Sequence, residues 1–211
     1  MAAKTDKLLS ILKLQPVVPV LIVDDVASAV PLARALVAGG LKAIEITMRT
    51  PAALDAIRAV ADEVEGAVPG AGTILNPAHF DAAVKAGSQF IVSPGTTRSL
   101  LDAARGSDVA LLPGAATASE VMTLREEGYD VLKFFPAEQA GGAAYLKSLS
   151  SPLAGTLFCP TGGISLKNAK DYLSLPNVVC VGGSWVAPKE LVEKGDWAGI
   201  TKLAAEAAAL K

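Results

Sequence analysis

Groups that bind metals or form disulfides are scarce in this sequence. Its 211 residues include two cysteines and one histidine. Cys159 and Cys180 are too few for a disulfide framework, and neither stands at a metal-ligand spacing from His79. We therefore expect the two thiols to lie in the core, and we expect no metal site and no cofactor.

Excess charge and long apolar runs are also lacking. The formal net charge is −2 and 19% of the residues are charged, so no overall field favours nucleic acid or an anionic membrane surface. No apolar run approaches a membrane span, and no signal-peptide segment follows the charged N-terminus. The sequence predicts a soluble cytoplasmic protein in which a few placed groups hold any bound anion.

Apolar residues are abundant, at 51%, and occur in short runs that alternate with helical segments. The runs that we predict as strands are Val17–Val23, Ala43–Thr47, Val68–Gly72, Phe90–Ser93, Val109–Pro113, Val131–Phe134, Leu157–Pro160 and Val178–Val181. Helices are predicted at about residues 27–38, 51–63, 76–86, 99–105, 117–127, 142–149, 165–173 and 196–210, after an N-terminal helix in residues 1–14.

The order of these segments predicts the fold. Strands that alternate with helices form a parallel sheet, and eight such units close most simply into a (β/α)8 TIM barrel. A doubly wound open sheet is the alternative. No linker or shift in composition divides the chain, so we expect residues 1–211 to form a single (β/α)8 barrel domain with a short N-terminal helix.

One charged residue interrupts the sixth predicted strand. Lys133 lies within Val131–Phe134, and a strand buried on both faces has no solvated side for an ammonium group. Because alternate strand residues share a face, Lys133 and Phe135 should point into the barrel and Phe134 should pack on helices. Either a structural ion pair neutralises Lys133, or its free amine is the reactive group of the protein.

Polar residues at other strand ends are expected to surround this lysine, because TIM-barrel sites form at the carboxyl ends of the strands. Strand alternation turns Glu45 into the barrel, and Arg49 should reach its mouth. Thr73 and Thr161 should lie over the same opening. Spacing alone leaves open a purely structural ion pair between Glu45 and Lys133.

Two glycine-rich segments follow the last two predicted strands. Gly162-Gly163 and Gly182-Gly183-Ser184 occupy the loops that commonly bind phosphate in TIM barrels. Without Cβ atoms, successive N–H groups can approach an anion closely, and the N-terminus of a following helix would add partial positive charge. The pair of segments predicts a phosphate site, and two tight strand-to-helix turns are the alternative.

Several longer blocks resemble the 2-keto-3-deoxy-6-phosphogluconate (KDPG)/KHG aldolase family. They are Ile44-Glu45-Ile46-Thr47-Met48-Arg49-Thr50, Gly70-Ala71-Gly72-Thr73-Ile74-Leu75-Asn76, Ser93-Pro94-Gly95, Lys133-Phe134-Phe135-Pro136-Ala137-Glu138, Phe158-Cys159-Pro160-Thr161-Gly162-Gly163-Ile164 and Cys180-Val181-Gly182-Gly183-Ser184-Trp185. The resemblance implies a homotrimeric (β/α)8 class I aldolase of the Entner–Doudoroff pathway, acting through a Schiff base. Members cleave KDPG to pyruvate and glyceraldehyde 3-phosphate, and many also cleave 4-hydroxy-2-oxoglutarate to pyruvate and glyoxylate.

The resemblance also implies roles for single residues. Lys133 matches the Schiff-base lysine, and Glu45 matches the proton-transfer residue. Arg49 and Thr73 match positions that hold the pyruvyl carboxylate. The other matched positions are Pro94, Phe135 and Thr161, which line the pocket, and Gly162, Gly163, Gly183 and Ser184, which bind the phosphate.

A few positions depart from the family pattern, among them Pro69, Arg98 and Ala115-Ala116, and none removes a group that the chemistry requires. Arg49 favours a gluconate enzyme over the related phosphogalactonate aldolases. Two other functional classes remain as alternatives: a different phosphate-binding TIM-barrel enzyme such as an isomerase, and a non-catalytic barrel that binds a sugar-acid phosphate. An isomerase has no need for a lysine within the sixth strand.

Overall fold

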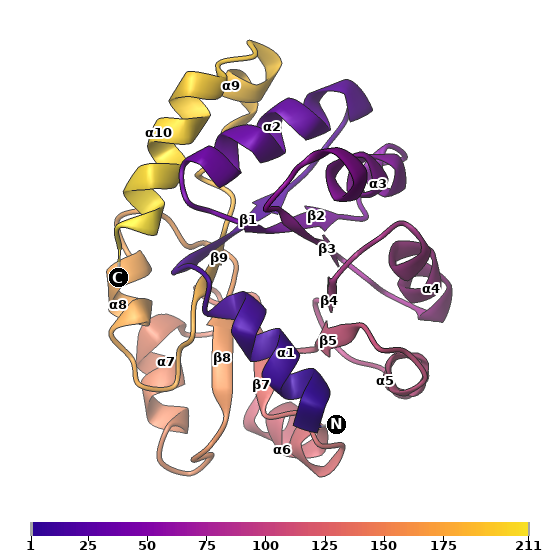
Figure 1. Ribbon diagram of the computed structural model, residues 1–211. Coiled ribbons are helices and arrows are strands. Elements are labelled where there is room, and N and C mark those ends of the chain that lie inside the picture. Colours follow the sequence, from indigo (N-terminus) through magenta and orange to yellow (C-terminus); the bar gives the residue numbers. More distant parts are fainter. Residues whose placement is uncertain (1, 211) are drawn as a thin grey trace.

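The computed structural model describes residues 2–210 and shows an α/β fold with parallel strands (Figure 1). The strands are β1 (Val17–Leu21), β2 (Ala43–Thr47), β3 (Val68–Gly72), β4 (Phe90–Val92), β5 (Ala110–Leu112), β6 (Gly114–Ala115), β7 (Val131–Phe134), β8 (Leu157–Pro160) and β9 (Val181–Gly183). The helices are α1 (Ala2–Leu12), α2 (Val26–Ala38), α3 (Ala53–Glu63), α4 (Pro77–Lys85), α5 (Arg98–Arg105), α6 (Ala118–Glu126), α7 (Gly142–Leu149), α8 (Ala169–Leu173), α9 (Lys189–Glu193) and α10 (Trp197–Ala208). Met1 and Lys211, the ends of the predicted domain, lie outside the described residues.

The strands form two sheets. A six-stranded sheet has the order β5-β4-β3-β2-β1-β9, and a three-stranded sheet has the order β6-β7-β8. Two isolated parallel bridges, Phe158↔Val178 and Thr161↔Gly182, connect the smaller sheet to the segment that contains β9. Figure 1 shows the strands around a common centre, with helix α1 across it and the other helices outside the strands. The predicted parallel α/β architecture is thus confirmed.

Two predicted strands differ from those observed by more than their last one or two residues. Val109–Pro113 contains only β5, and the chain passes at Pro113 to β6 in the other sheet, because Pro113 has no N–H for the ladder, although its carbonyl accepts a hydrogen bond from Lys133 N at 2.9 Å. The last strand is Val181–Gly183 rather than Val178–Val181. Helix α9 was not predicted. None of its residues is buried, so its sequence lacks the regular spacing of apolar residues that predicts a helix.

The buried side chains form two clusters, one on each face of the strands. Ile44, Leu132 and Phe134 belong to the cluster beneath the helices, whereas Ala43 and Val131 belong to the inner cluster. The ring of Phe134 stacks on Tyr145 of α7, with the ring centroids 5.7 Å apart. The predicted alternation on β2 and β7 is therefore confirmed, and Phe134 packs against a helix.

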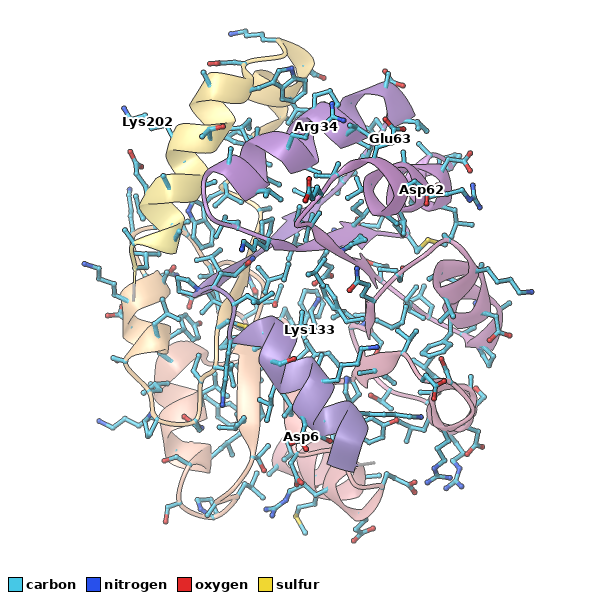
Figure 2. The ribbon with its side chains drawn as sticks, viewed as in Figure 1. Asp6, Arg34, Asp62, Glu63, Lys133 and Lys202 are labelled. Carbon is cyan, nitrogen blue, oxygen red and sulfur yellow. The ribbon has the colours of Figure 1, made fainter. Side chains whose placement is uncertain are left out.

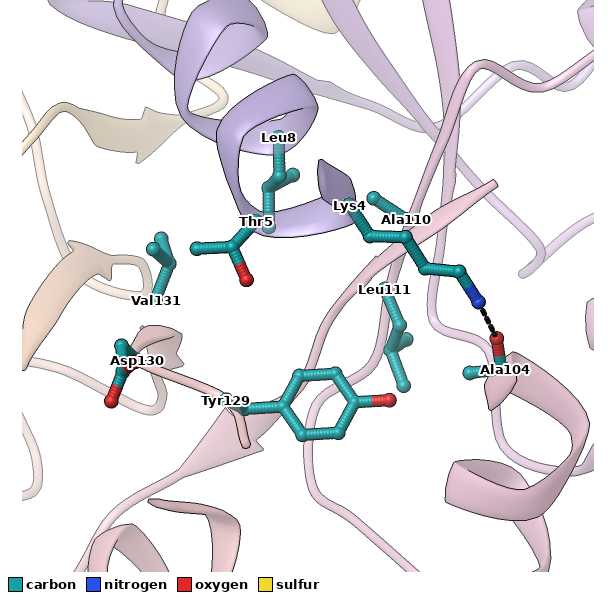
Figure 3. Close-up of a pocket in the computed structure, with 9 residues that line it drawn as sticks. All are labelled: Lys4, Thr5, Leu8, Ala104, Ala110, Leu111, Tyr129, Asp130 and Val131. Carbon is teal, nitrogen blue, oxygen red and sulfur yellow. Dashed lines mark hydrogen bonds between the residues drawn. The ribbon is translucent and has the colours of Figure 1, made fainter. Parts of the chain in front are cut away.

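Helix α1 covers one end of the inner cluster. Its residues Leu8, Ile11 and Leu12 are buried there, and the helix crosses the centre of the strand ring in Figure 1. Figure 3 shows the small cavity beneath it, where Lys4 Nζ donates a 3.0 Å hydrogen bond to the Ala104 carbonyl at the end of α5. The cavity volume of about 10 Å³ suits no more than a single water molecule. Helix α1 and its neighbours therefore leave little free space at this end of the inner cluster.

Candidate active site

Lys133 and Glu45 meet inside the ring of strands. Lys133 Nζ lies 3.4 Å from Glu45 Oε1, and each side chain is only 4% exposed. Figure 2 shows Lys133 near the centre of the molecule, unlike the peripheral Lys202 and Asp62. A buried pair adds little net stability, because desolvation offsets the attraction. The arrangement does place an amine and a carboxylate close enough together to contact the same small molecule at once.

Gly72 makes room for the Glu45 carboxylate. A Cβ atom on Gly72 would lie 2.0 Å from Glu45 Oε1, a separation that no real side chain tolerates. Gly72 on β3 is paired with Thr47 on the neighbouring strand β2, which also carries Glu45. The register of the two strands therefore fixes the position of Gly72 against the Glu45 side chain. In the sequence, Gly72 belongs to a block that resembles the aldolase family. The structure gives the reason for a glycine there, which is the contact with the Glu45 side chain on the neighbouring strand.

We expect Gly72→Ala to lower kcat about 100-fold, because the methyl group would displace the carboxylate from Lys133 by an ångström or more. The control is Gly95→Ala, since a Cβ at Gly95 meets no atom within 4 Å. It should retain full activity. Steady-state kinetics of both purified variants make the comparison, and an equal loss in the two would contradict the role assigned to Gly72.

Arg49 and Thr73 lie at the ends of β2 and β3. Arg49 Nε donates a 3.0 Å hydrogen bond to Thr73 Oγ1. Within residues 2–210 the two Nη groups of Arg49 have no acceptor, so they can bind a carboxylate in a bidentate pair. Thr73 has a φ of +58°, which costs a β-branched residue about 1–3 kcal/mol and is typical of functional sites.

The residues predicted to line the pocket surround Lys133. Its Nζ lies 5.4 Å from the centroid of the Phe135 ring. Gly114 is paired with Lys133 across β6 and β7, and the Pro94 backbone lies against Gly114. Thr161 follows β8, and its buried Oγ1 has no hydrogen-bond partner among the described residues. These side chains provide an apolar wall and one unused hydroxyl.

The first glycine loop presents backbone donors. The carbonyls of Thr161 and Gly162 accept hydrogen bonds from Ala137 N at 2.8 Å and Glu138 N at 3.1 Å, and the Gly163 carbonyl accepts one from Asn168 Nδ2 at 3.2 Å. Both glycines have positive φ, 104° and 75°. In the described part of the chain, no group accepts a hydrogen bond from the N–H of Gly163. A turn with fixed carbonyls and an available N–H group suits an anion.

The second glycine segment lies beside the first, because Thr161 is bridged to Gly182. Ser184 is exposed and borders a cleft of about 870 Å³ whose other walls come from the end of β1, from α2 and from α9. Helices α8 and α9 begin at Ala169 and Lys189, after intervening turns, and each has five residues. A contribution of their N-termini to a phosphate site stays a prediction.

The remaining candidates take no part in this arrangement. Cys159 and Cys180 are buried with their Sγ atoms 3.5 Å apart, as expected for core thiols. His79 lies in the first turn of α4, where its backbone N–H donates to the Asn76 side chain at 2.9 Å. Residues 2–210 hold no cluster of His, Cys, Asp and Glu suited to a metal ion. None of the helices in that range has the length and apolar character to cross a membrane.

Comparisons with known proteins agree with this geometry. Residues 8–203 match the family model described as KDPG and KHG aldolase. A 2-dehydro-3-deoxy-phosphogluconate aldolase from Pseudoalteromonas atlantica is 52% identical over 92% of this chain and 90% of its own length. A KHG/KDPG aldolase from Escherichia coli is 50% identical over 94% and 93%. A KDPG aldolase from Legionella pneumophila, with pyruvate captured as a covalent carbinolamine, has a TM-score of 0.93, with 43% identity over 95% of this chain and 98% of that one.

Proposed function

Because the chain belongs to the KDPG and KHG aldolase family, we propose that it is a class I aldolase that cleaves KDPG to pyruvate and glyceraldehyde 3-phosphate. The observation that carries the proposal is the Lys133 amine, buried inside the strands at 3.4 Å from the Glu45 carboxylate. A class I aldolase requires a reactive amine beside a group that moves protons. The covalent carbinolamine of the Legionella relative is the first intermediate of that chemistry.

Lys133 acts as the nucleophile in this proposal. Its Nζ attacks the C2 carbonyl of the substrate, and loss of water from the carbinolamine gives a protonated imine. Glu45 accepts the proton of the C4 hydroxyl, the C3–C4 bond breaks, and its electron pair moves into the imine to form an enamine. Glyceraldehyde 3-phosphate leaves. Glu45 then returns a proton to C3, and hydrolysis of the imine releases pyruvate and the free lysine.

The other residues orient the two ends of the substrate. We assign the carboxylate to Arg49 and Thr73, whose guanidinium and hydroxyl are joined at the mouth. The pocket wall consists of Pro94, Phe135 and Thr161, and the phosphate is assigned to Gly162, Gly163, Gly183 and Ser184. The available N–H group of Gly163 in the first loop supports the phosphate end.

The proposal extends to the finer points of fold and assembly. The two bridges between β8 and the β9 segment support a closed (β/α)8 barrel formed by one domain over the whole chain. A homotrimer rests on the family resemblance, and a cytoplasmic location suits a chain whose two cysteines are too few for a disulfide framework. The partner of the site is a small molecule, a phosphorylated 2-keto-3-deoxy sugar acid or pyruvate.

A coupled assay for pyruvate tests the proposal. We expect KDPG to be turned over with consumption of NADH by added lactate dehydrogenase. An isomerase or a non-catalytic barrel would release no pyruvate, and that result would overturn the assignment. Running the assay with 4-hydroxy-2-oxoglutarate determines whether the second activity named for the Escherichia coli relative is present here as well.

A further inference from the structure

Glu138 and Tyr172 form a contact that the mechanism does not use. Glu138 lies in the loop between β7 and α7, and Tyr172 lies on α8, after the first glycine loop. The Tyr172 hydroxyl donates a hydrogen bond to Glu138 Oε1. Tyr172 is only 1% exposed, and its burial, followed by the Glu138 carboxylate, raises its pKa well above the usual range. The hydroxyl therefore keeps its proton and remains the donor.

Glu138 also contacts the glycine loop directly. Its backbone N–H donates to the Gly162 carbonyl at 3.1 Å. A Cβ atom on Gly163 would lie 2.6 Å from Glu138 Cγ, so the stem of the side chain packs on that glycine. The carboxylate then reaches α8 through Tyr172. Glu138 thus restrains the loop through three contacts: its backbone N–H bonds to Gly162, its Cγ packs on Gly163, and its carboxylate binds Tyr172 on the helix that follows the loop.

We propose that Glu138 and Tyr172 are positioning residues that hold the Gly162-Gly163 loop in its phosphate-binding shape. This inference rests on the proposed function, because it concerns the phosphate end of the same site. Glycines with positive φ have many other conformations available, and a loop built from two of them needs external restraint to keep its N–H groups aimed at an anion. Lys133 is not among the contacts that the structure shows for either side chain.

The test separates phosphate binding from chemistry. We expect Tyr172→Phe and Glu138→Ala each to raise KM for KDPG about tenfold, the loss expected when a hydrogen bond to a charged group is removed. Glu138→Gln keeps an acceptor and should give a smaller rise. The rate at which the methyl protons of pyruvate exchange with deuterated water should stay within about twofold of the wild type, since pyruvate carries no phosphate. The Kd for inorganic phosphate, measured by calorimetry, should rise with KM.

A double variant, Tyr172→Phe with Glu138→Ala, should be no worse than Glu138→Ala alone, because Tyr172 acts through its contact with Glu138. The matched control is Tyr145→Phe on α7, whose hydroxyl has no partner among the described residues and which should leave KM unchanged. Equal losses in pyruvate exchange and in KDPG turnover would overturn the inference, and so would unchanged phosphate binding. If the wild type released no pyruvate from KDPG, the proposed function would fail, and the phosphate Kd would still report on Glu138 and Tyr172.

Discussion

Lys133→Met should lower kcat for KDPG by at least about 10⁴-fold, because the variant has no amine to form the imine on which bond cleavage depends. The same change leaves the Glu45 carboxylate buried without a partner, at a cost of about 3–5 kcal/mol of stability. Lys133→Arg retains the positive charge and is the second variant. Both should be inactive, and thermal unfolding shows whether each is folded under the conditions of the assay.

Chemical trapping identifies the nitrogen that reacts. Borohydride added together with pyruvate should attach a reduced pyruvyl group to the wild type, and peptide mass spectrometry should find it at Lys133. Lys202, which lies at the periphery of the molecule in Figure 2, serves as an internal control and should remain unmodified. A pyruvyl adduct elsewhere, or full activity in Lys133→Arg, would exclude Lys133 as the nucleophile.

Glu45→Gln should slow exchange of the pyruvate methyl protons with deuterated water by about 10²- to 10⁴-fold, the range for removal of a general acid–base group. The amide is nearly isosteric with the carboxylate, so the crowded contact with Gly72 is retained. Proton NMR of pyruvate measures the rate directly. Glu65→Gln, at an exposed position after α3, is the matched control and should exchange at the wild-type rate.

Borohydride trapping also distinguishes an effect on imine formation at Lys133 from an effect on proton transfer by Glu45. Glu45→Gln removes the buried partner of Lys133, so slower imine formation could by itself slow exchange. If borohydride traps pyruvate on Glu45→Gln while exchange remains slow, the defect lies in proton transfer at C3. Unchanged exchange in a variant that still forms the adduct would rule out Glu45 as the proton-transfer group.

Local pattern was enough to predict the direction of the key side chains. The period of two along β2 and β7 places Glu45 and Lys133 on the inner face and Phe134 on the outer one, and the structure confirms each. The apolar run of Val109–Pro113 gave no sign of a break between two sheets, because a strand's partners are not encoded in the strand itself. The same limit applies to β9, whose pairing to β1 begins only at Val181.

Two contacts between distant residues were not predicted from the sequence. Gly72 is required by the side chain of Glu45 on another strand, and Glu138 meets Tyr172 across 34 positions. Gly162-Gly163 follows β8 as predicted, whereas Gly182 and Gly183 lie within β9 rather than in a loop after it. The short turns that precede α8 and α9 were not predicted.

The pairing of β1 with β9 has a consequence for how the chain is made. Strand β1 is hydrogen-bonded to β2 on one side and to β9 on the other, with Val17 registered against Val181. During synthesis one edge of β1 therefore stays unpaired until nearly the whole polypeptide has left the ribosome. An open strand edge is a template for association with other chains. Nascent chains that stall before residue 181 are thus the species for which a chaperone is most needed.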